Sequence, residues 1–283
     1  MEKIKEILRS MGMDEPENLS AFPHEEGAGE YRVWKVEYPD RNYVLKCAKG
    51  NESEIYEQYL KAAPFAPQLA AKGTVNGEDY LLLSHVEGNN LIRCSRDDLM
   101  AATKSLIEMQ RRYWNTTPNF EALRSRENRR QYLNDALLQQ VYDAYLADCR
   151  QIPWTLCHDD LLPFNVINSH GIGVFIDWEV GGILPYPASL ARLIAHTNEN
   201  SAAPFYMKRD DIEAAVDFYY EQFLKPMGIT RDAFLHSLEL HLFYEYCEWV
   251  YVGNKFGSKD SDLYCKYAIL ATNMAKKIIR QNR

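Results

Sequence analysis

The spacing of apolar residues changes near residue 88, and this change limits the folds open to the chain. Before it, short runs alternate between polar and apolar residues, as strands with one buried face do. The turn sequence Asn76-Gly77 separates two such runs, and one stretch of helical spacing interrupts the series. The order strand, strand, helix, strand, strand predicts a small antiparallel sheet with one helix packed on it. The expected strands are residues 31–38, 43–48, 70–75 and 80–86, and the expected helix is residues 52–62.

After residue 88, apolar residues recur every three or four positions, which is the spacing of amphipathic helices. Two short apolar runs in the middle of this region are typical of buried strands instead. The region is therefore expected to be mainly helical. The expected helices are residues 97–113, 127–147 and those from 210 to the end, and the expected short strands are residues 155–157 and 174–176.

These patterns together predict an α+β protein with two lobes. Residues 1–87 are expected to form a small N-terminal antiparallel β lobe with one helix, preceded by an amphipathic N-terminal helix. Residues 88–283 are expected to form a larger, mainly helical C-terminal lobe. A chain of 283 residues is long enough to give both lobes substantial cores.

Charge and composition exclude several classes of partner. The formal net charge of −8 argues against nucleic acid, because a phosphate backbone requires a basic surface. The same acidic balance suits a cationic small molecule. No apolar run reaches the roughly 18 residues of a membrane span, and residues 1–8 are too highly charged for a signal peptide. The six cysteines are scattered, so we expect free thiols in a reducing, cytoplasmic protein.

One stretch carries side chains that phosphoryl transfer from a nucleotide requires. Asn165 stands five positions after Asp160, and Asp177 follows a short apolar run twelve positions further on. A carboxylate at the first position can accept the proton of an attacking hydroxyl. An amide and a second carboxylate can hold Mg²⁺ on a triphosphate. We therefore predict Asp160 as the catalytic residue and Asn165 and Asp177 as magnesium ligands, with His158 as a buried support of the loop.

The sequence His158-Asp159-Asp160-Leu161-Leu162-Pro163-Phe164-Asn165, with Ile176-Asp177-Trp178-Glu179 after it, resembles the aminoglycoside phosphotransferase and choline kinase family. The resemblance covers most of the chain and implies a protein-kinase-like fold that uses ATP or GTP with Mg²⁺. It implies that Lys46 binds the α- and β-phosphates, with Glu54 as its best ion-pair partner and Glu52 and Glu57 as alternatives. It also implies that the adenine binds to backbone groups of a hinge within residues 81–88, with Ser84, His85 and Val86 as the candidate residues.

The chain departs from the family pattern at several places. Asp159 stands where the family usually has glycine, and Ser189 stands where it has an aspartate that supports the catalytic loop. Residues 25–30, Glu-Glu-Gly-Ala-Gly-Glu, occupy the place of a phosphate-covering loop. Glycines there would let backbone N–H groups approach phosphate, whereas the glutamates would repel it, and a plain hairpin turn is an equal alternative.

The acceptor site is expected on the C-terminal helices. Residues 241–251 mix aromatic and acidic side chains, and Glu245, Glu248 and Trp249 are candidates for holding an ammonium group. The alternative is a helix that buries its aromatic residues while its glutamates face water. A protein acceptor is disfavoured, since no long activation segment ending in Ala-Pro-Glu follows Asp177.

The sequence thus predicts an ATP- or GTP-dependent phosphotransferase that moves the γ-phosphoryl to a hydroxyl of a small molecule. A second hypothesis, motivated by Asp159 and Ser189, is a kinase-like protein that binds a nucleotide or a partner with little turnover. A metal-dependent phosphohydrolase is a weaker third hypothesis, because the other six histidines lack the spacing of metal ligands.

Overall fold

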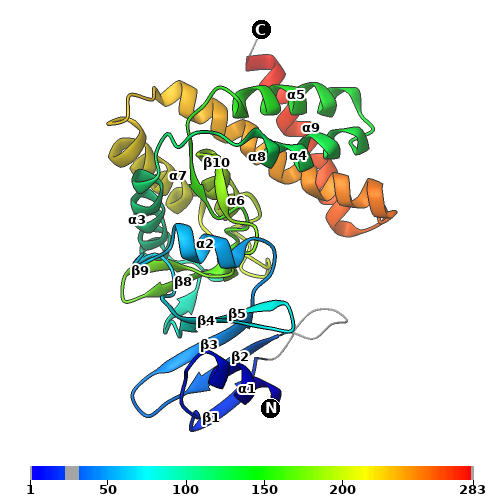
Figure 1. The fold of residues 1–283 in the computed structure, drawn as a ribbon. Helices are drawn as coiled ribbons and strands as arrows, with labels where there is room; N and C mark the ends of the chain where they lie inside the picture. The colour runs from blue at the N-terminus through cyan, green and yellow to red at the C-terminus, as the bar shows by residue number, and fades with distance from the viewer. Residues whose placement is uncertain (1, 23–31, 282–283) are drawn as a thin grey trace.

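A computed structural model describes residues 2–22 and 32–281 of the chain, and these residues form an α+β structure (Figure 1). An antiparallel sheet lies at the N-terminal end of the molecule, and most helices gather at the opposite end, where the chain also ends. The sheet has five strands in the order β1-β2-β3-β5-β4. Its strands are β1 (Asn18–Ala21), β2 (Val33–Glu37), β3 (Asn42–Cys47), β4 (Leu69–Val75) and β5 (Glu78–Ser84).

The sheet is covered on one side by the first helix, α1 (Glu2–Ser10). Its apolar residues Ile4, Ile7 and Leu8 are buried in one cluster with residues of β2, β3 and β5. The predicted amphipathic N-terminal helix and both predicted hairpins are therefore confirmed. Strand β1 extends the sheet beyond the four expected strands, since Asn18 to Ala21 pair with β2.

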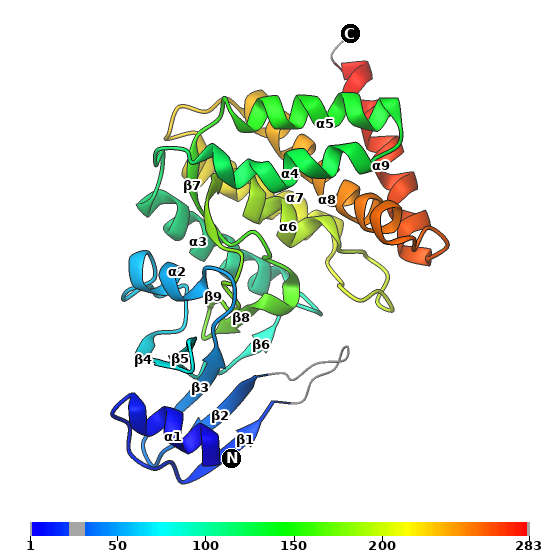
Figure 2. The same ribbon diagram turned by 45° about the vertical axis from the view of Figure 1, so that its right-hand side comes forward.

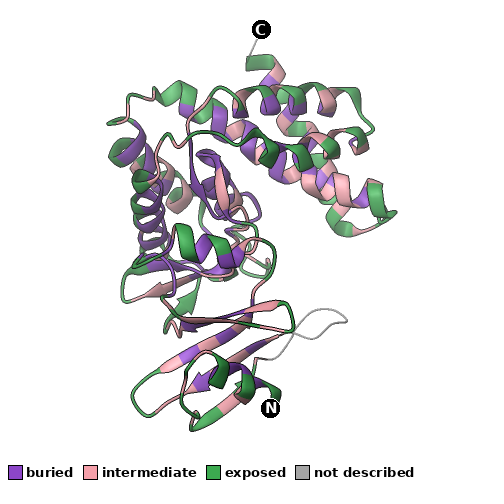
Figure 3. Cartoon of the chain, viewed as in Figure 1, coloured by how far each residue is buried: buried purple, intermediate pink, exposed green. Residues whose placement is uncertain are grey.

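Helix α2 (Glu52–Gln58) connects the sheet to the helical part. Its residues Ile55 and Tyr56 belong to the largest buried cluster, which also contains residues of β5 and of the helices after residue 88. The sheet and the helices therefore share a core, and Figure 3 shows buried segments in both parts of the molecule. We propose a boundary between two lobes at residues 87 and 88, just after β5 ends.

The helical part contains two small sheets, and the segments between their strands carry Asp160, Asn165 and Asp177. One sheet pairs β7 with β10, and the other has the order β6-β8-β9. Figure 2 shows α4, α5, α8 and α9 together at the end of the molecule away from the five-stranded sheet. The helices are α3 (Arg96–Arg112), α4 (Arg124–Arg129), α5 (Ala136–Cys149), α6 (Pro187–Ala195), α7 (Arg209–Tyr219), α8 (Arg231–Phe256) and α9 (Asp262–Gln281), and the strands are β6 (Asn89–Asn90), β7 (Trp154–Cys157), β8 (Val166–Ser169), β9 (Ile172–Phe175) and β10 (Gly182–Pro185).

The single helix expected at residues 127–147 is wrong, because the structure has the separate helices α4 and α5 there. Asn134 adopts a positive φ of 51°, which a right-handed helix cannot contain. Asp135 then begins α5 by accepting a hydrogen bond from the Leu138 N–H at 2.9 Å. The Asn134-Asp135 pair is a helix stop followed by an N-cap, and apolar spacing alone does not reveal such a break.

Two further expectations concern the segment 25–30 and the absence of a membrane span. The acidic glycine-containing segment 25–30 lies outside the described residues. Within residues 2–22 and 32–281, every helix is too short or too polar to cross a bilayer.

Candidate active site

The predicted catalytic loop begins with a histidine held inside the protein. His158 is fully buried, and its Nε2–H donates to the Ile176 carbonyl at 2.7 Å. Burial lowers the pKa of His158 to about 4, so the ring is neutral near pH 7. The backbone N–H of His158 donates to the Ser189 hydroxyl at 2.9 Å. Ser189 therefore still supports the loop by a hydrogen bond, although it lacks the charge of the aspartate that the resemblance implies at this position.

Asp159 occupies a backbone position that favours glycine. Its φ is 45°, in the left-handed region that few residues other than glycine, asparagine and aspartate adopt. Its carboxylate pairs with Arg126, whose side chain is almost completely buried. The additional carboxylate beside the catalytic loop is thus neutralised by a buried cation from α4.

Asp160 is held by two side chains. Arg192 on α6 donates to Asp160 Oδ1 through Nη2 at 2.6 Å and Nε at 3.1 Å. Asn165 Nδ2 donates to Asp160 Oδ2 at 3.2 Å and to the Asp160 backbone oxygen at 2.8 Å. Burial raises the pKa of the Asp160 carboxyl above its ordinary value, although Arg192 acts in the opposite direction. The group is a carboxylate base of increased proton affinity.

Asn165 and Asp177 present oxygen atoms suited to Mg²⁺. Because both acceptors on Asp160 face Asn165 Nδ2, the amide orientation is fixed and its Oδ1 points elsewhere. Asp177 follows β9 with a φ of 65°, and it lines the same cavity as Asn165. Among the described residues, no group of three or more His, Cys, Asp or Glu side chains forms a metal site. One carboxylate and one amide oxygen nevertheless fit Mg²⁺, which completes its shell with phosphate oxygens and water.

Lys46 on β3 pairs with Glu52 rather than with Glu54. Its Nζ lies 2.9 Å from Glu52 Oε1 and also contacts Asp177. The prediction of Glu54 is wrong, because Glu54 lies about 200° around the helix from Glu52 and is exposed. Glu52 shares the buried face of α2 with Ile55 and Tyr56, and that spacing identifies it in the sequence. Burial acts to lower the pKa of Lys46, but Glu52 and Asp177 outweigh it and keep the ammonium charged.

The start of α2 is attached to the segment after Asp177. Asn51 donates to the carbonyls of Glu179 and Gly181 at 3.3 and 2.6 Å. Gly50 has a φ of 54°, and a Cβ on it would lie 2.2 Å from the Glu179 oxygen. Only glycine therefore allows this close approach. The contact places Glu52 where its carboxylate also accepts from the Trp178 backbone N–H at 3.3 Å.

A cavity of about 460 Å³ brings these residues together. Lys46, Glu52 and Asp177 contribute charged groups to its lining, and Val44 and Leu83 contribute apolar surface. The cavity is lined by Phe22, Val33, Val44, Lys46, Glu52, Tyr56, Pro67, Leu83, Ser84, His85, Val86, Phe164, Asn165, Ile167, Ile176 and Asp177. The combination of apolar and charged lining residues is suited to a nucleotide, in which an apolar base is attached to phosphates.

The three predicted hinge residues all line this cavity, but they differ in the backbone groups they offer. The N–H groups of Ser84 and His85 already donate to the carbonyls of Gln68 and Asn42, at 2.8 and 3.0 Å. Val86 lies beyond the end of β5, and its backbone groups have no hydrogen-bond partner among the described residues. Val86 is thus the hinge residue whose N–H and carbonyl are both available to a ligand, whereas His85 has only its carbonyl left.

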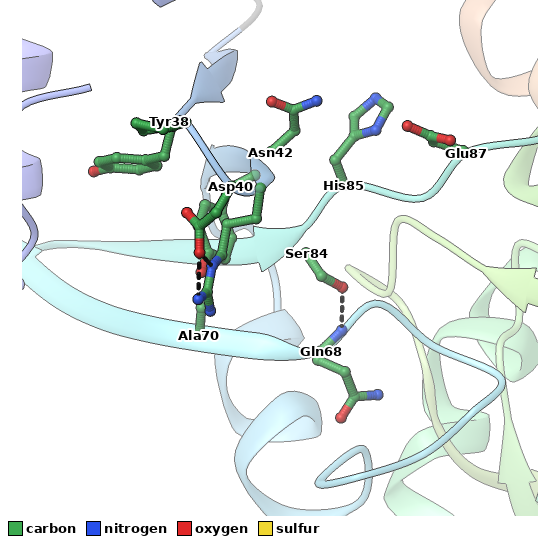
Figure 4. Close-up of a pocket in the computed structure, with 11 residues that line it drawn as sticks. Tyr38, Asp40, Asn42, Gln68, Ala70, Ser84, His85 and Glu87 are labelled. Atoms are coloured by element: carbon green, nitrogen blue, oxygen red, sulfur yellow. Dashed lines mark hydrogen bonds and ion pairs between the residues drawn. The ribbon is translucent and has the colours of Figure 1, made fainter. Parts of the chain in front are cut away.

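A second hollow, of about 670 Å³, lies on the other side of the hinge (Figure 4). Ser84 accepts from the Gln68 N–H at its edge, and Asp40 and Arg41 pair with each other at 2.6 Å. Its charged side chains are thus exposed or already paired. We assign this hollow no role.

The predicted acceptor residues are placed apart from the cavity. Glu245 is buried and pairs with Arg192 at 2.8 Å and with His196 at 3.3 Å. Burial acts to raise the pKa of Glu245, but Arg192 and His196 outweigh it and hold it below its ordinary value. Glu248 pairs with Arg129, and Trp249 stacks on Tyr267 with ring centroids 5.8 Å apart. Both glutamates are therefore neutralised by protein cations.

Comparison with known proteins shows the class to which this site belongs. Residues 23–210, about two thirds of the chain, match the phosphotransferase enzyme family (APH). The chain belongs to this family. No curated protein matches its sequence significantly.

Solved structures with the same arrangement confirm the predicted protein-kinase-like fold. A choline/ethanolamine kinase family protein from Mesorhizobium loti is 14% identical with a TM-score of 0.62, over 99% of this chain and 95% of that one. A thermostable mutant of aminoglycoside phosphotransferase APH(4)-Ia, in a ternary complex with ADP and hygromycin B, is 16% identical with a TM-score of 0.60, over 98% and 97%. Choline kinase from Cryptosporidium parvum is 13% identical with a TM-score of 0.55, over 91% and 89%.

Proposed function

We propose that this protein transfers the γ-phosphoryl of ATP or GTP to a hydroxyl of a small molecule. The observation that carries the proposal is the meeting of Lys46, Asn165 and Asp177 around one cavity, with Asp160 hydrogen-bonded to Asn165 beside it. Membership of the phosphotransferase family supports the reaction class. The cysteines, all free thiols, fit the reducing cytoplasmic compartment that we propose for it.

The reaction requires one proton transfer and one displacement at phosphorus. Asp160 accepts the proton of the acceptor hydroxyl as its oxygen forms a bond to the γ-phosphorus. The bond from that phosphorus to the β,γ-bridging oxygen breaks, and the nucleoside diphosphate leaves with the electron pair. Asp160 then returns its proton to solvent, so the enzyme is unchanged at the end.

The remaining site residues hold the nucleotide. Lys46 carries the positive charge that the α- and β-phosphates need, and Glu52 keeps this ammonium in place. Asn165 Oδ1 and the Asp177 carboxylate would hold Mg²⁺, which when bound neutralises charge on the phosphates. Val86 offers its backbone groups to the base.

The acceptor is proposed to be a small molecule, because the relatives of this fold include an aminoglycoside phosphotransferase and choline kinases. The notion of a cationic acceptor held by Glu245 and Glu248 loses support, since each carboxylate is paired with an arginine. Neutral sugars and simple alcohols therefore belong in a substrate panel beside amines, amino alcohols and aminoglycosides.

The proposal is tested by measuring ADP formation from Mg-ATP and Mg-GTP across that panel. Acceptor-dependent ADP formation by the wild-type protein, absent from Asp160→Asn, is the expected result. Nucleotide binding by calorimetry without any turnover would instead favour the kinase-like binding protein. If the protein shows neither nucleotide binding nor turnover, the proposal that it is an enzyme is rejected.

Replacement of Glu52 by glutamine is expected to weaken Mg-ATP binding about 10- to 100-fold, whereas Glu54→Gln should leave it within twofold. The reason is that Glu52 is buried against Lys46, and loss of one partner of a buried pair is costly. Calorimetric titration with Mg-ATP checks both variants. Equal effects of the two substitutions would contradict the assignment of Glu52.

The rate is expected to fall at acid pH with a midpoint above the ordinary aspartate pKa of about 3.9. Asp160 works as a base only when ionised, and burial raises its pKa, so activity is lost as pH falls through that raised value. Protonation of His158 does not explain a loss of activity above pH 4, because its own pKa is about 4. The measurement is kcat against pH, with Mg-ADP binding over the same range as control. A kcat that stays constant down to about pH 4 would contradict the prediction that Asp160 is a base of raised pKa.

A further inference from the structure

We propose that Arg192 is a positioning residue that determines which oxygen of Asp160 receives the acceptor's proton. The inference rests on the proposed phosphotransfer and adds to it a residue of α6 that lies outside the sequence motif. It follows from the hydrogen bonds that the Asp160 carboxylate makes within the protein.

The Asp160 carboxylate has few acceptor sites left. Each carboxylate oxygen has two lone-pair directions. Oδ1 receives both Nε and Nη2 of Arg192, at 3.1 and 2.6 Å, so both of its sites are used. Oδ2 receives Asn165 Nδ2 at 3.2 Å, which leaves one site. The acceptor hydroxyl therefore donates to Asp160 Oδ2.

Arg192 is itself fixed from the side opposite Asp160. Its Nη1 donates to Glu245 Oε2 on α8 at 2.8 Å and lies 3.3 Å from His196 Nε2. His196 in turn contacts the Tyr267 hydroxyl on α9 at 2.7 Å. Because the guanidinium is a planar fork, contacts on both sides fix its orientation. Through Arg192, the C-terminal helices thus set the orientation of the Asp160 carboxylate, although Glu245 lies 85 positions later in the chain.

The first test does not depend on catalysis and uses crystal structures of the wild-type protein and of Arg192→Gln. In the wild type, Asp160 Oδ1 is expected to accept from Arg192 and Oδ2 from Asn165 Nδ2. In Arg192→Gln the Asp160 carboxylate is expected to rotate away from Asn165, because the planar fork that holds Oδ1 is gone. Arg130→Gln is the control, since Arg130 lies on the surface and pairs with Asp143. An Asp160 carboxylate that keeps the wild-type orientation in Arg192→Gln overturns the proposal.

The second test uses the acceptor found in the substrate panel. Arg192→Gln is expected to lower kcat about 10- to 100-fold and to leave the KM for Mg-ATP within twofold. Arg192→Lys keeps the charge but not the planar fork, so its kcat should stay low. A kcat of Arg192→Gln within threefold of the wild type, or full recovery of kcat in Arg192→Lys, would overturn the proposal.

Folding of the variants is controlled separately. Arg192→Gln leaves the buried Glu245 without its main partner, so the double variant Arg192→Gln/Glu245→Gln, which removes both charges, is measured as well. The double variant should show the rotated Asp160 carboxylate while unfolding near the wild-type temperature. Absence of phosphoryl transfer in the wild type would reject the proposed function, whereas the crystal structures would still decide whether Arg192 orients Asp160.

Discussion

Asp160→Asn is expected to lower kcat by about 10²–10⁴-fold while leaving Mg-nucleotide affinity within twofold. The amide cannot accept the hydroxyl proton, and general base catalysis contributes a factor of this size. Asparagine keeps the side-chain volume and can still accept from Arg192, so the loop should stay in place. The measurement combines steady-state kinetics with calorimetric titration of Mg-ADP.

The matched control is Asp143→Asn, a substitution of the same kind on the exposed surface of α5. It should leave kcat unchanged. A kcat for Asp160→Asn within threefold of the wild type would show that another group removes the proton. Equal losses in kcat and in nucleotide affinity would indicate that the substitution disturbs the whole site rather than its base.

Asp159→Gly is expected to lower the free energy of unfolding by about 2–4 kcal/mol, even though it introduces the residue usual in the family. Glycine removes the strain of the positive φ, a gain of about 1 kcal/mol at most. The substitution also leaves the buried Arg126 without its carboxylate, and breaking a buried pair costs about 3–5 kcal/mol. The loss of the ion pair therefore outweighs the relief of strain. Urea unfolding followed by circular dichroism measures the difference.

The double variant Asp159→Gly/Arg126→Met tests the cause of this loss. It removes both charges and should regain most of the stability, since an uncharged pair has no buried charge to compensate. Asp159→Gly that is as stable as the wild type would show that Arg126 is compensated elsewhere. The comparison also distinguishes the effect of the backbone conformation from that of the charge.

The chemistry of the site was largely predictable from the sequence, because its main residues lie close together in the chain. Asp160 and Asn165 share one short loop, and Asp177 follows the strand that comes next. The five-residue spacing limits how far apart two of these side chains can lie. The predicted roles of Asp160, Asn165 and Asp177 stay predictions until turnover is measured, but their juxtaposition is what the sequence indicated.

The break between α4 and α5 was missed at the local Asn134-Asp135 pair, but the errors in the site arose where the outcome depended on contacts between distant segments. Glu54 seemed a suitable partner for Lys46 in sequence, but the approach of Gly50 to Glu179 orients α2 so that Glu52 faces inward. Glu245 seemed free to bind an ammonium group, but Arg192, fifty-three positions earlier, pairs with it. The pairing of Glu245 has no local sequence pattern, whereas Glu52 could have been found from its helical spacing with Ile55 and Tyr56.

By itself the sequence determined the classes of most secondary structure and the α+β fold, and it predicted the groups that we propose for phosphoryl transfer. These properties follow from apolar spacing and from residues a few positions apart, which act over short distances. Only the tertiary structure decided which charges neutralise one another: Glu52 with Lys46, Arg126 with Asp159, and Arg192 with both Asp160 and Glu245. The reason is that ion pairing depends on the distance between side chains in space and on burial, and both are set by the packing of the whole chain.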